Sequence, residues 1–320
     1  MKILVFIPAK NESVSIKEVI NNSRSEVEKF INFSPEVLVI DDGSTDNTSE
    51  IAKENKATVI RHKINIGLGE IFMEATEYAV KKNFDILITI DGDGQFDTHD
   101  IPKLLDPILK KEADFVTGNR FNSGHDIKNM PKLKQWGNKK MSKLISSIIL
   151  DKYQDVSCGF RVYSKEALLN LNLNGGFTYT HEVFLNLAFK KIKIKEIPIN
   201  VTYFAKRKSR IANNIFKYTF NTSKIIINSV IKYKPLKIFG RISSFLLIIN
   251  LPISLILTIR YILIGVLSPY KAFGIISFLL ILLAIFLLIV GIILENISKL
   301  QINIDKILYH ERKNNNFTEK

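Results

Sequence analysis

The feature that most constrains the fold of this chain is an uncharged apolar run from Ala272 to Leu294. As a helix rising 1.5 Å per residue it would span roughly 34 Å, enough to cross a bilayer. A second apolar stretch runs from Ser243 to Leu267 and contains one charge, Arg260, which can snorkel towards the far interface. Two buried core helices would need a large soluble shell, and only a short tail follows them. The sequence therefore predicts a membrane hairpin within 241–294, with transmembrane helices at about 243–267 and 272–294.

Charge is concentrated before this hairpin. The chain carries a net charge of +14, and ten Lys or Arg residues without any Asp or Glu lie between Lys206 and Arg241. Basic and apolar residues recur there at helical spacing, which predicts a basic amphipathic helix at 206–240 on an anionic leaflet rather than a nucleic-acid site. Lys and Arg flank the hairpin on both sides, so the positive-inside rule places both termini in the cytosol.

Two further features bear on localisation and assembly. The single cysteine, Cys158, excludes an intrachain disulfide and fits a reducing compartment. The apolar run at the N-terminus, Ile3–Ile7, is too short for a signal peptide, and polar residues follow it too soon. The tail at 295–320 mixes charges with apolar residues at helical spacing. It fits a second surface helix or a homo-oligomer contact, and both alternatives stay open. The membrane hairpin is the other segment through which a homo-oligomer could form.

The first 205 residues alternate strand-like and helix-like patterns, which is typical of an α/β domain with a mainly parallel sheet and helices on both faces. Ligands bind such sheets beyond the carboxyl ends of the strands. The expected strands are Ile3–Ile7, Glu36–Ile40, Ala57–Arg61, Ile86–Ile90 and Asp114–Thr117. The expected helices are Ser15–Phe30, Asn47–Glu54, Leu68–Lys81 and Ile101–Lys111.

Acidic residues follow the predicted central strand, in the stretch Asp91-Gly92-Asp93-Gly94-Gln95. Two carboxylates and an amide at a strand end form a hard oxygen site that suits Mg²⁺ or Mn²⁺ with positions open for substrate phosphates. The alternative is a solvated acidic turn. Neither a GxGxxG fingerprint nor a GxxxxGK[ST] loop occurs, so a dehydrogenase or P-loop enzyme is poorly supported.

Six short motifs occur in a characteristic order: Ile7-Pro8-Ala9-Lys10-Asn11-Glu12, Val39-Ile40-Asp41-Asp42-Gly43-Ser44-Thr45-Asp46, Asn65-Ile66-Gly67, Asp91-Gly92-Asp93-Gly94-Gln95, Gly118-Asn119-Arg120 and Cys158-Gly159-Phe160-Arg161. Together they resemble the inverting family-two glycosyltransferases with the GT-A fold. The nearest subgroup resembles dolichol-phosphate mannose synthase and the bacterial polyprenyl-phosphate glycosyltransferases, some of which carry membrane helices. The resemblance covers roughly residues 1–210.

The resemblance implies a role for each motif. The nucleotide and donor site would comprise Pro8, Ala9, Asn11, Glu12, Asp41, Asp42, Asn65, Gly67, Asp91 and Gly92, with Asp42 contacting the base and Asp41 behind it. The metal would be held by Asp91, Asp93 and Gln95. Lipid phosphate would be held by Arg120, Arg207, Lys208 and Arg210, although the last three depart from the usual form of that cluster. Catalytic roles would fall to Asp93, Asp155, Glu182 and Arg120.

The alternative for Asp155 and for Glu182 is a structural ion pair or a helix cap. Asp155 would otherwise orient the acceptor or Arg161. An attacking phosphate is already ionised at neutral pH and needs positioning by cations more than deprotonation. A hydroxyl acceptor would need a true base, and one of these two carboxylates would then be indispensable.

These observations predict a membrane-anchored enzyme that moves a single sugar from a nucleotide sugar (UDP-glucose, UDP-GlcNAc or GDP-mannose) to dolichyl or undecaprenyl phosphate. Single transfer is expected because the only tryptophan, Trp136, lies outside any Gln-x-x-Arg-Trp motif of processive relatives. The alternatives are transfer to a hydroxyl of a glycolipid or nascent glycan, and a non-catalytic protein that binds lipid phosphate.

Overall fold

The structure, a computed structural model, describes residues 1–121, 130–173, 179–204 and 215–318. It consists of two compact units. The first comprises Met1–Ile226 together with Leu308–Lys320 and is called the sheet unit here; the second, Ile227–Ile307, is called the helical unit.

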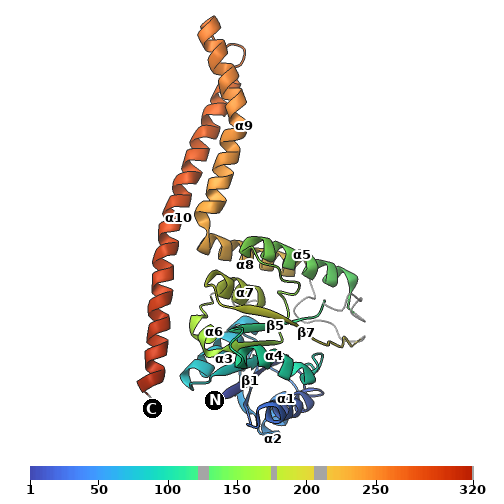
Figure 1. Ribbon diagram of the computed structural model, residues 1–320. Helices are drawn as coiled ribbons and strands as arrows, with labels where there is room; N and C mark the ends of the chain where they lie inside the picture. The colour runs from blue at the N-terminus through green and yellow to red at the C-terminus, as the bar shows by residue number, and fades with distance from the viewer. Residues whose placement is uncertain (122–129, 174–178, 205–214, 319–320) are drawn as a thin grey trace. The chain divides into compact units, whose positions relative to one another are not determined.

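The sheet unit is built on one sheet of seven strands in the described residues, in the order β3-β2-β1-β4-β6-β5-β7 (Figure 1). Every neighbouring pair is parallel except the two made by β6, which runs antiparallel to β4 and β5. The prediction of a mainly parallel sheet is confirmed, and each predicted strand is present within a few residues of its expected bounds. The strands are β1 Ile3–Ala9, β2 Glu36–Asp41, β3 Thr58–Arg61, β4 Ile86–Thr89, β5 Phe115–Asn119, β6 Arg161–Ser164 and β7 Ile194–Pro198.

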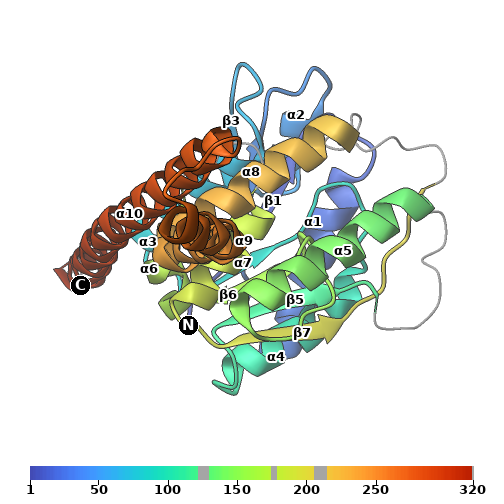
Figure 2. The same cartoon turned by 90° about the horizontal axis from the view of Figure 1, so that it is seen from above.

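Helices cover both faces of this sheet, as expected (Figure 2). Side chains alternate between faces along each strand, so Ile3, Val5 and Ile7 of β1 share a core with the helices α1 and α4. Phe6 points the other way, towards Phe72 of α3. The helices of the sheet unit are α1 Ile16–Ile31, α2 Thr48–Glu54, α3 Leu68–Lys81, α4 Ile101–Leu109, α5 Lys132–Ile149, α6 Lys165–Asn170 and α7 Thr180–Phe189.

The helical unit contains most of two long apolar helices, α9 Pro235–Ile264 and α10 Lys271–Thr318, preceded by the end of α8 Ile215–Tyr233. The two are joined by polar contacts: Ser243 Oγ donates to the Ala284 carbonyl at 2.8 Å, and Asn250 Nδ2 donates to the Ser277 carbonyl at 3.2 Å. Only 11% and 17% of their most apolar windows are buried, whereas the core helix of a soluble protein is mostly buried. Length, composition and exposure all suit membrane association.

Both apolar helices are longer than the sequence patterns predicted. Helix α9 begins at Pro235 rather than near Ser243, because proline is well accommodated in the first turn. Helix α10 continues to Thr318, since neither glycine nor proline interrupts the chain after Gly291. The tail is therefore the end of α10 and not a separate helix.

The last turns of α10 belong to the sheet unit and bind it through side chains. The Tyr309 hydroxyl donates to Glu166 Oε2 at 2.9 Å, and Arg312 donates to the Leu171 carbonyl at 2.7 Å. Arg312 also donates to Oδ1 of Asn172 at 3.2 Å. The tail thus contacts its own chain at the end of α6, and a homo-oligomer contact stays a prediction.

Candidate active site

The polar motifs after β1, β2 and β4 meet at one edge of the sheet. The Asp42 amide donates to the Ala9 carbonyl at 2.9 Å, and the Gly92 amide donates to the Pro8 carbonyl at 3.3 Å. A Cβ atom on Gly92 would lie 3.1 Å from the same Pro8 oxygen, so the close approach of the two loops favours glycine there. The Ser15 hydroxyl, at the start of α1, donates to the Gly92 carbonyl at 2.7 Å.

Asp41 is fully buried and fixes the loop that follows β2. Its carboxylate accepts from the Ser44 amide at 2.8 Å and from the Ser49 hydroxyl. The Ser44 hydroxyl then accepts from the Asn11 amide at 2.8 Å, and Asn11 Oδ1 accepts from the Thr45 amide at 2.7 Å. Asp41 therefore stabilises the loop after β2 from its buried side. Asn11 links the loop after β1 to the loop after β2 through hydrogen bonds.

Asp42 organises a third loop. Its carboxylate accepts from Asn65 Nδ2 at 2.7 Å, from the Ile66 amide at 2.6 Å and from the Gly67 amide at 3.2 Å. Gly67 has a φ of 102°, which a residue with a side chain rarely adopts. The structure thus brings together Asp42, Asn65 and Gly67, three of the residues predicted to bind the donor.

The acidic residues after β4 lie at the same edge. Burial and the neighbouring charge of Asp93 raise the pKa of Asp91 to about 7, and the charge of Glu12 acts in the same direction. The backbone amide of Gln95 donates to Asp93 Oδ1 at 3.0 Å. The oxygens of Asp91 are packed closely, because a Cβ atom on Gly159 would lie 3.2 Å from each of them.

This donor set fits a divalent cation. A raised carboxyl pKa means that one more negative charge is unfavourable beside Asp93 and Glu12, and a cation would relieve that repulsion. The ligands are hard oxygens, which suit Mg²⁺ or Mn²⁺. Among the described residues no three His, Cys, Asp or Glu side chains form a complete metal cluster.

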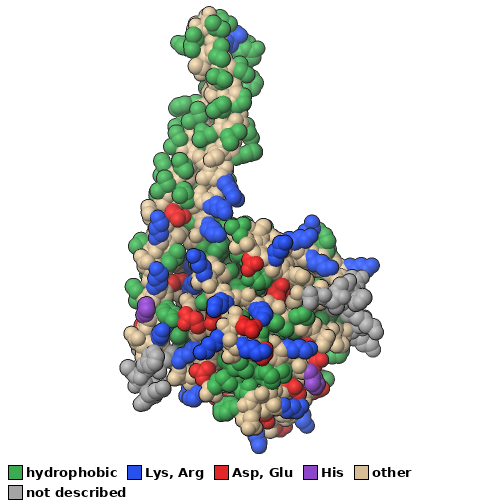
Figure 3. Space-filling model, in the orientation of Figure 1, with side chains coloured by type: hydrophobic (Ala, Val, Ile, Leu, Met, Phe, Trp, Pro, Cys, Tyr) green, Lys and Arg blue, Asp and Glu red, His purple; other side chains and the backbone are tan. Residues whose placement is uncertain are grey.

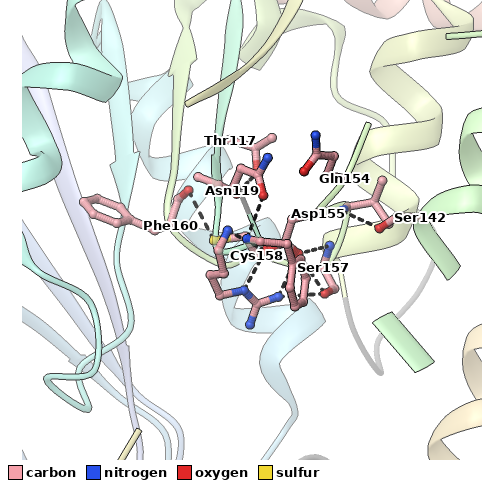
Figure 4. A network of polar contacts seen from close by, with 12 residues as sticks. Thr117, Asn119, Ser142, Gln154, Asp155, Ser157, Cys158 and Phe160 are labelled. Atoms are coloured by element: carbon pink, nitrogen blue, oxygen red, sulfur yellow. Dashed lines mark hydrogen bonds and ion pairs between the residues drawn. The ribbon is translucent and has the colours of Figure 1, made fainter. Parts of the chain in front are cut away.

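Arg120 and Asp155 form a buried ion pair beside these carboxylates. Arg120 Nε donates to Asp155 Oδ2 at 2.6 Å, and its terminal nitrogens donate to Asp155 Oδ1 and Ser157 Oγ, each at 2.8 Å, and to the Tyr203 hydroxyl at 3.0 Å. Figure 4 shows Asp155, Ser157 and Cys158 within this network. Burial alone would raise the pKa of Asp155, but the charge and hydrogen bonds of Arg120 outweigh burial and lower it.

The expectation that Asp155 orients Arg161 is wrong, because Asp155 is paired with Arg120. Arg161 is fully buried and donates to the carbonyls of Val156 and Thr180, both at 2.9 Å. Its guanidinium carbon lies 5.4 Å from the Phe115 ring centre. Arg161 thus links the Asp155 loop to the start of α7.

Lys134 of α5 is a site residue that the sequence did not reveal. Burial and the charge of Arg120 lower its pKa, while the negative charges of Asp91, Asp93 and Asp155 oppose that shift. Its Nζ lies 5.2 Å from the ring centre of Tyr203. Lys134 therefore shares one electrostatic environment with the acidic pair and with the Arg120–Asp155 pair.

For the remaining predicted site residues, the structure gives the position of Glu182 but does not describe the basic cluster after β7. Glu182 lies in the first turn of α7 and is half-buried. Its neighbour His181 is fully neutral near pH 7, because burial and the charge of Arg161 lower its pKa to about 3. Arg207, Lys208 and Arg210 lie outside the described residues.

Comparison with known proteins gives this geometry a context. The family model described as Glycosyl transferase family 2 matches residues 4–171. The chain is 33% identical to the UDP-N-acetylglucosamine–dolichyl-phosphate N-acetylglucosaminyltransferase of Methanococcus voltae, over 63% of this chain and 86% of that protein. It is 25% identical to the undecaprenyl-phosphate mannosyltransferase of Micrococcus luteus, over 62% of this chain and 83% of that protein. It is 27% identical to the dolichol-phosphate mannosyltransferase of Pyrococcus furiosus, over 75% of this chain and 69% of that protein.

A solved structure shares the architecture. The glucosyl-3-phosphoglycerate synthase from Mycobacterium tuberculosis, in complex with Mn²⁺, uridine diphosphate and glucosyl-3-phosphoglycerate, matches with a TM-score of 0.54 at 19% identity. The match covers 72% of this chain and 78% of that one. The likeness shows a shared GT-A-like fold.

Proposed function

The chain belongs to glycosyl transferase family 2 and is a glycosyltransferase, and from this premise we propose that it transfers one sugar, with inversion, from a nucleotide sugar to a polyprenyl phosphate. The observation that carries the proposal is the meeting of two oppositely charged groups at one sheet edge. Asp91 and Asp93 suit a cation and the donor diphosphate, while Lys134 and Arg120 suit a second phosphate.

On the donor side, Asp42 would hold the loop 65–67 as one wall of the nucleoside pocket, and Pro8, Ala9 and Glu12 would line the other. Asp91, Asp93 and Gln95 would hold Mg²⁺ or Mn²⁺, which offsets the charge that grows on a departing diphosphate. The donor would be a UDP-sugar or GDP-mannose.

On the acceptor side, a phosphate oxygen would attack the anomeric carbon of the sugar while the bond from that carbon to the donor diphosphate breaks. The products would be the sugar-phosphate lipid and a nucleoside diphosphate. Lys134 would position the acceptor phosphate directly, with Arg207, Lys208 or Arg210 as predicted further contacts. Charged hydrogen bonds to phosphate combine strength with orientation.

A phosphate acceptor also fits the state of Asp155. A hydroxyl acceptor would need a general base, which must be able to accept a proton near neutral pH. Asp155 has a lowered pKa, and both of its oxygens accept from Arg120. Its role in the proposal is therefore to position Arg120 rather than to remove a proton.

The apolar helices would keep the enzyme at the membrane that contains the lipid acceptor. By the positive-inside rule, the sheet unit and both termini would lie on the cytosolic side. Cytosolic nucleotide sugars would then reach the donor site directly.

The test is a transfer assay with full-length protein in neutral detergent, using UDP- and GDP-sugars, polyprenyl phosphate and Mg²⁺ or Mn²⁺. The expected product is a polyprenyl-phosphate sugar whose anomeric configuration, read by NMR, is opposite to that of the donor. Label in a diacylglycerol or a glycan would favour the hydroxyl acceptor instead. Binding of polyprenyl phosphate without transfer from any sugar nucleotide would favour the non-catalytic alternative.

A further inference from the structure

Glu196 of β7 binds the backbone of the segment that contains Asp155. Its Oε1 accepts from the amides of Gln154 and Asp155, at 2.9 and 2.7 Å, and its Oε2 accepts from the Gln154 amide at 2.9 Å. The contacts join residues that are 41 and 42 positions apart in the chain. Figure 4 shows Gln154 and Asp155 in the network around Arg120. One carboxylate therefore fixes two consecutive amides of an irregular segment.

Strand pairing also places Glu196 near the other partner of the buried ion pair. Strand β7 pairs in parallel with β5, and Glu196 lies opposite Thr117 in this register. Arg120 directly follows the last residue of β5. Glu196 thus joins a strand beside Arg120 to the backbone of Asp155, and the Asp155 carboxylate in turn accepts from Arg120.

A carboxylate at position 196 is stabilised by the two amides that it accepts. Burial raises the pKa of Glu196, and the charges of Asp155 and Asp151 act in the same direction. The hydrogen bonds from the amides of Asp155 and Gln154 oppose this shift. Like charges destabilise each other, so the amide hydrogen bonds are the interactions that favour a negative charge here.

The preceding residue of β7 provides a contrast. Lys195 pairs with Glu112 at 2.7 Å, and the two side chains are 45% and 49% exposed. Red and blue side chains are interspersed over the sheet unit in Figure 3. Exposed ion pairs of this kind contribute little to stability. Lys195→Gln is therefore a matched control for changes at Glu196, because it alters a charge on the same strand without touching the Asp155 segment.

We propose that Glu196 is a positioning residue: by fixing the amides of Gln154 and Asp155, it sets the Asp155 carboxylate where it orients Arg120 towards the acceptor phosphate. Asp155 is fully buried, and both of its oxygens accept from Arg120, so a shift of its backbone moves the guanidinium as well. A displacement of about 1 Å in a positioning group can lower a rate roughly a hundredfold. This inference rests on the proposed function and adds to it a residue that does not itself touch a substrate.

The first test is sugar transfer by full-length protein in neutral detergent. Glu196→Ala should lower kcat/KM for polyprenyl phosphate roughly tenfold or more, because hydrogen bonds to a charged group are lost, and should leave the KM of the nucleotide sugar unchanged. Glu196→Gln keeps one acceptor oxygen and should lower kcat/KM less, and Lys195→Gln should behave as wild type. A loss of equal size for both substrates would show a merely structural role and would overturn the proposal.

A double-mutant cycle tests whether Glu196 acts through Asp155. Asp155→Asn should also lower kcat/KM for polyprenyl phosphate. Adding Glu196→Ala to that variant should lower it by less than about twofold further, because both changes act on the same guanidinium. Effects that multiply as independent changes would show that Glu196 acts elsewhere, and would overturn the proposal.

Hydrogen exchange separates this inference from the proposed function. The amides of Gln154 and Asp155 should exchange at least about tenfold faster in Glu196→Ala than in wild type, measured by mass spectrometry on peptides that cover residues 150–157, whereas Lys195→Gln should leave them unchanged. Equal exchange in wild type and Glu196→Ala would overturn the inference even if the protein transfers sugar. Absence of sugar transfer in the wild-type protein would instead reject the proposed function, and with it the role of Glu196 in transfer, whatever the exchange rates.

Discussion

The buried pair of Arg120 and Asp155 gives the most demanding prediction. Replacing Asp155 by Asn keeps the size of the side chain but removes its charge and sets an amide beside Arg120. Breaking a buried ion pair by removing one partner costs about 3–5 kcal/mol. The low end, about 3 kcal/mol, is expected here because Arg120 keeps Tyr203 and Ser157 as acceptors, at 3.0 and 2.8 Å.

The single cysteine supplies the assay. Cys158 is fully buried and burial raises the pKa of its thiol to about 12, so it should react with an alkylating reagent only when the sheet unit opens. Labelling of Cys158 across a urea series, in full-length protein in neutral detergent, then reports the free energy of opening. The control is Glu112→Gln, which breaks an exposed pair with Lys195 and should cost at most about 1 kcal/mol.

The pH dependence follows from the same pair. The pKa of Asp155 is lowered in the folded protein from an ordinary value of 3.8. Its contribution to stability is therefore present above that value and is lost as the pH falls below it through the folded pKa. The difference between wild type and Asp155→Asn should be constant near neutrality and shrink in acid. A loss no larger than that of Glu112→Gln at pH 7 would refute the reasoning.

Three further predictions concern the site itself. Gly159→Ala should lower the transfer rate roughly tenfold, since its Cβ must displace the Asp91 oxygens 3.2 Å away, whereas Gly137→Ala, which meets nothing within 4 Å, should leave transfer rates unchanged. Asp93→Asn should abolish transfer while thermal stability is kept, and calorimetry should show that Mn²⁺ no longer strengthens nucleotide binding; unchanged Mn²⁺ dependence would remove Asp93 from the metal site. Asp42→Ala should raise the donor Kd about tenfold or more without changing the acceptor KM, because charged hydrogen bonds to the loop 65–67 are lost; equal effects on both substrates would contradict a donor role.

The local patterns of the sequence predicted the elements that have short apolar runs or helical spacing of apolar residues. Ile3 to Ile7 form an uninterrupted apolar run, as expected for a strand buried on both faces, and the first five strands could be recognised from their apolar and β-branched residues. Strand β6 could not, because polar Arg161 and Ser164 form its two ends and leave only two residues between them. The fully buried Arg161 donates to the Val156 and Thr180 carbonyls and lies against the Phe115 ring, and none of these contacts gives a local sequence pattern. Tertiary contacts of this kind leave no periodic trace.

The residues of the candidate site likewise fall into those that the sequence reveals and those that only the structure reveals. Motifs at strand ends, such as Asp41-Asp42 and Asp91-Gly92-Asp93, are found from the sequence because parallel strands bring their carboxyl ends together. Lys134 lacks such a signal, since it is one lysine among several in α5. The helix that contains Lys134 has Gln135 and Asn138 buried and Trp136 exposed, so its polar side faces the protein. The sequence of α5 does not show which side is buried, and the structure was needed to place Lys134 in the site.

The antiparallel direction of β6 has a consequence for how such an enzyme can diversify. Because β6 runs against its neighbours, the chain leaves the sheet edge at Arg120 and returns to that edge at Asp155. The ion pair between these residues closes residues 121–154 into a loop whose ends are joined independently of what lies between them. We therefore expect this segment to tolerate exchange or lengthening without a change in the strand register. Because this segment contains Lys134, transplanting it from a relative would test whether preference for the acceptor can be transferred separately from preference for the nucleotide sugar.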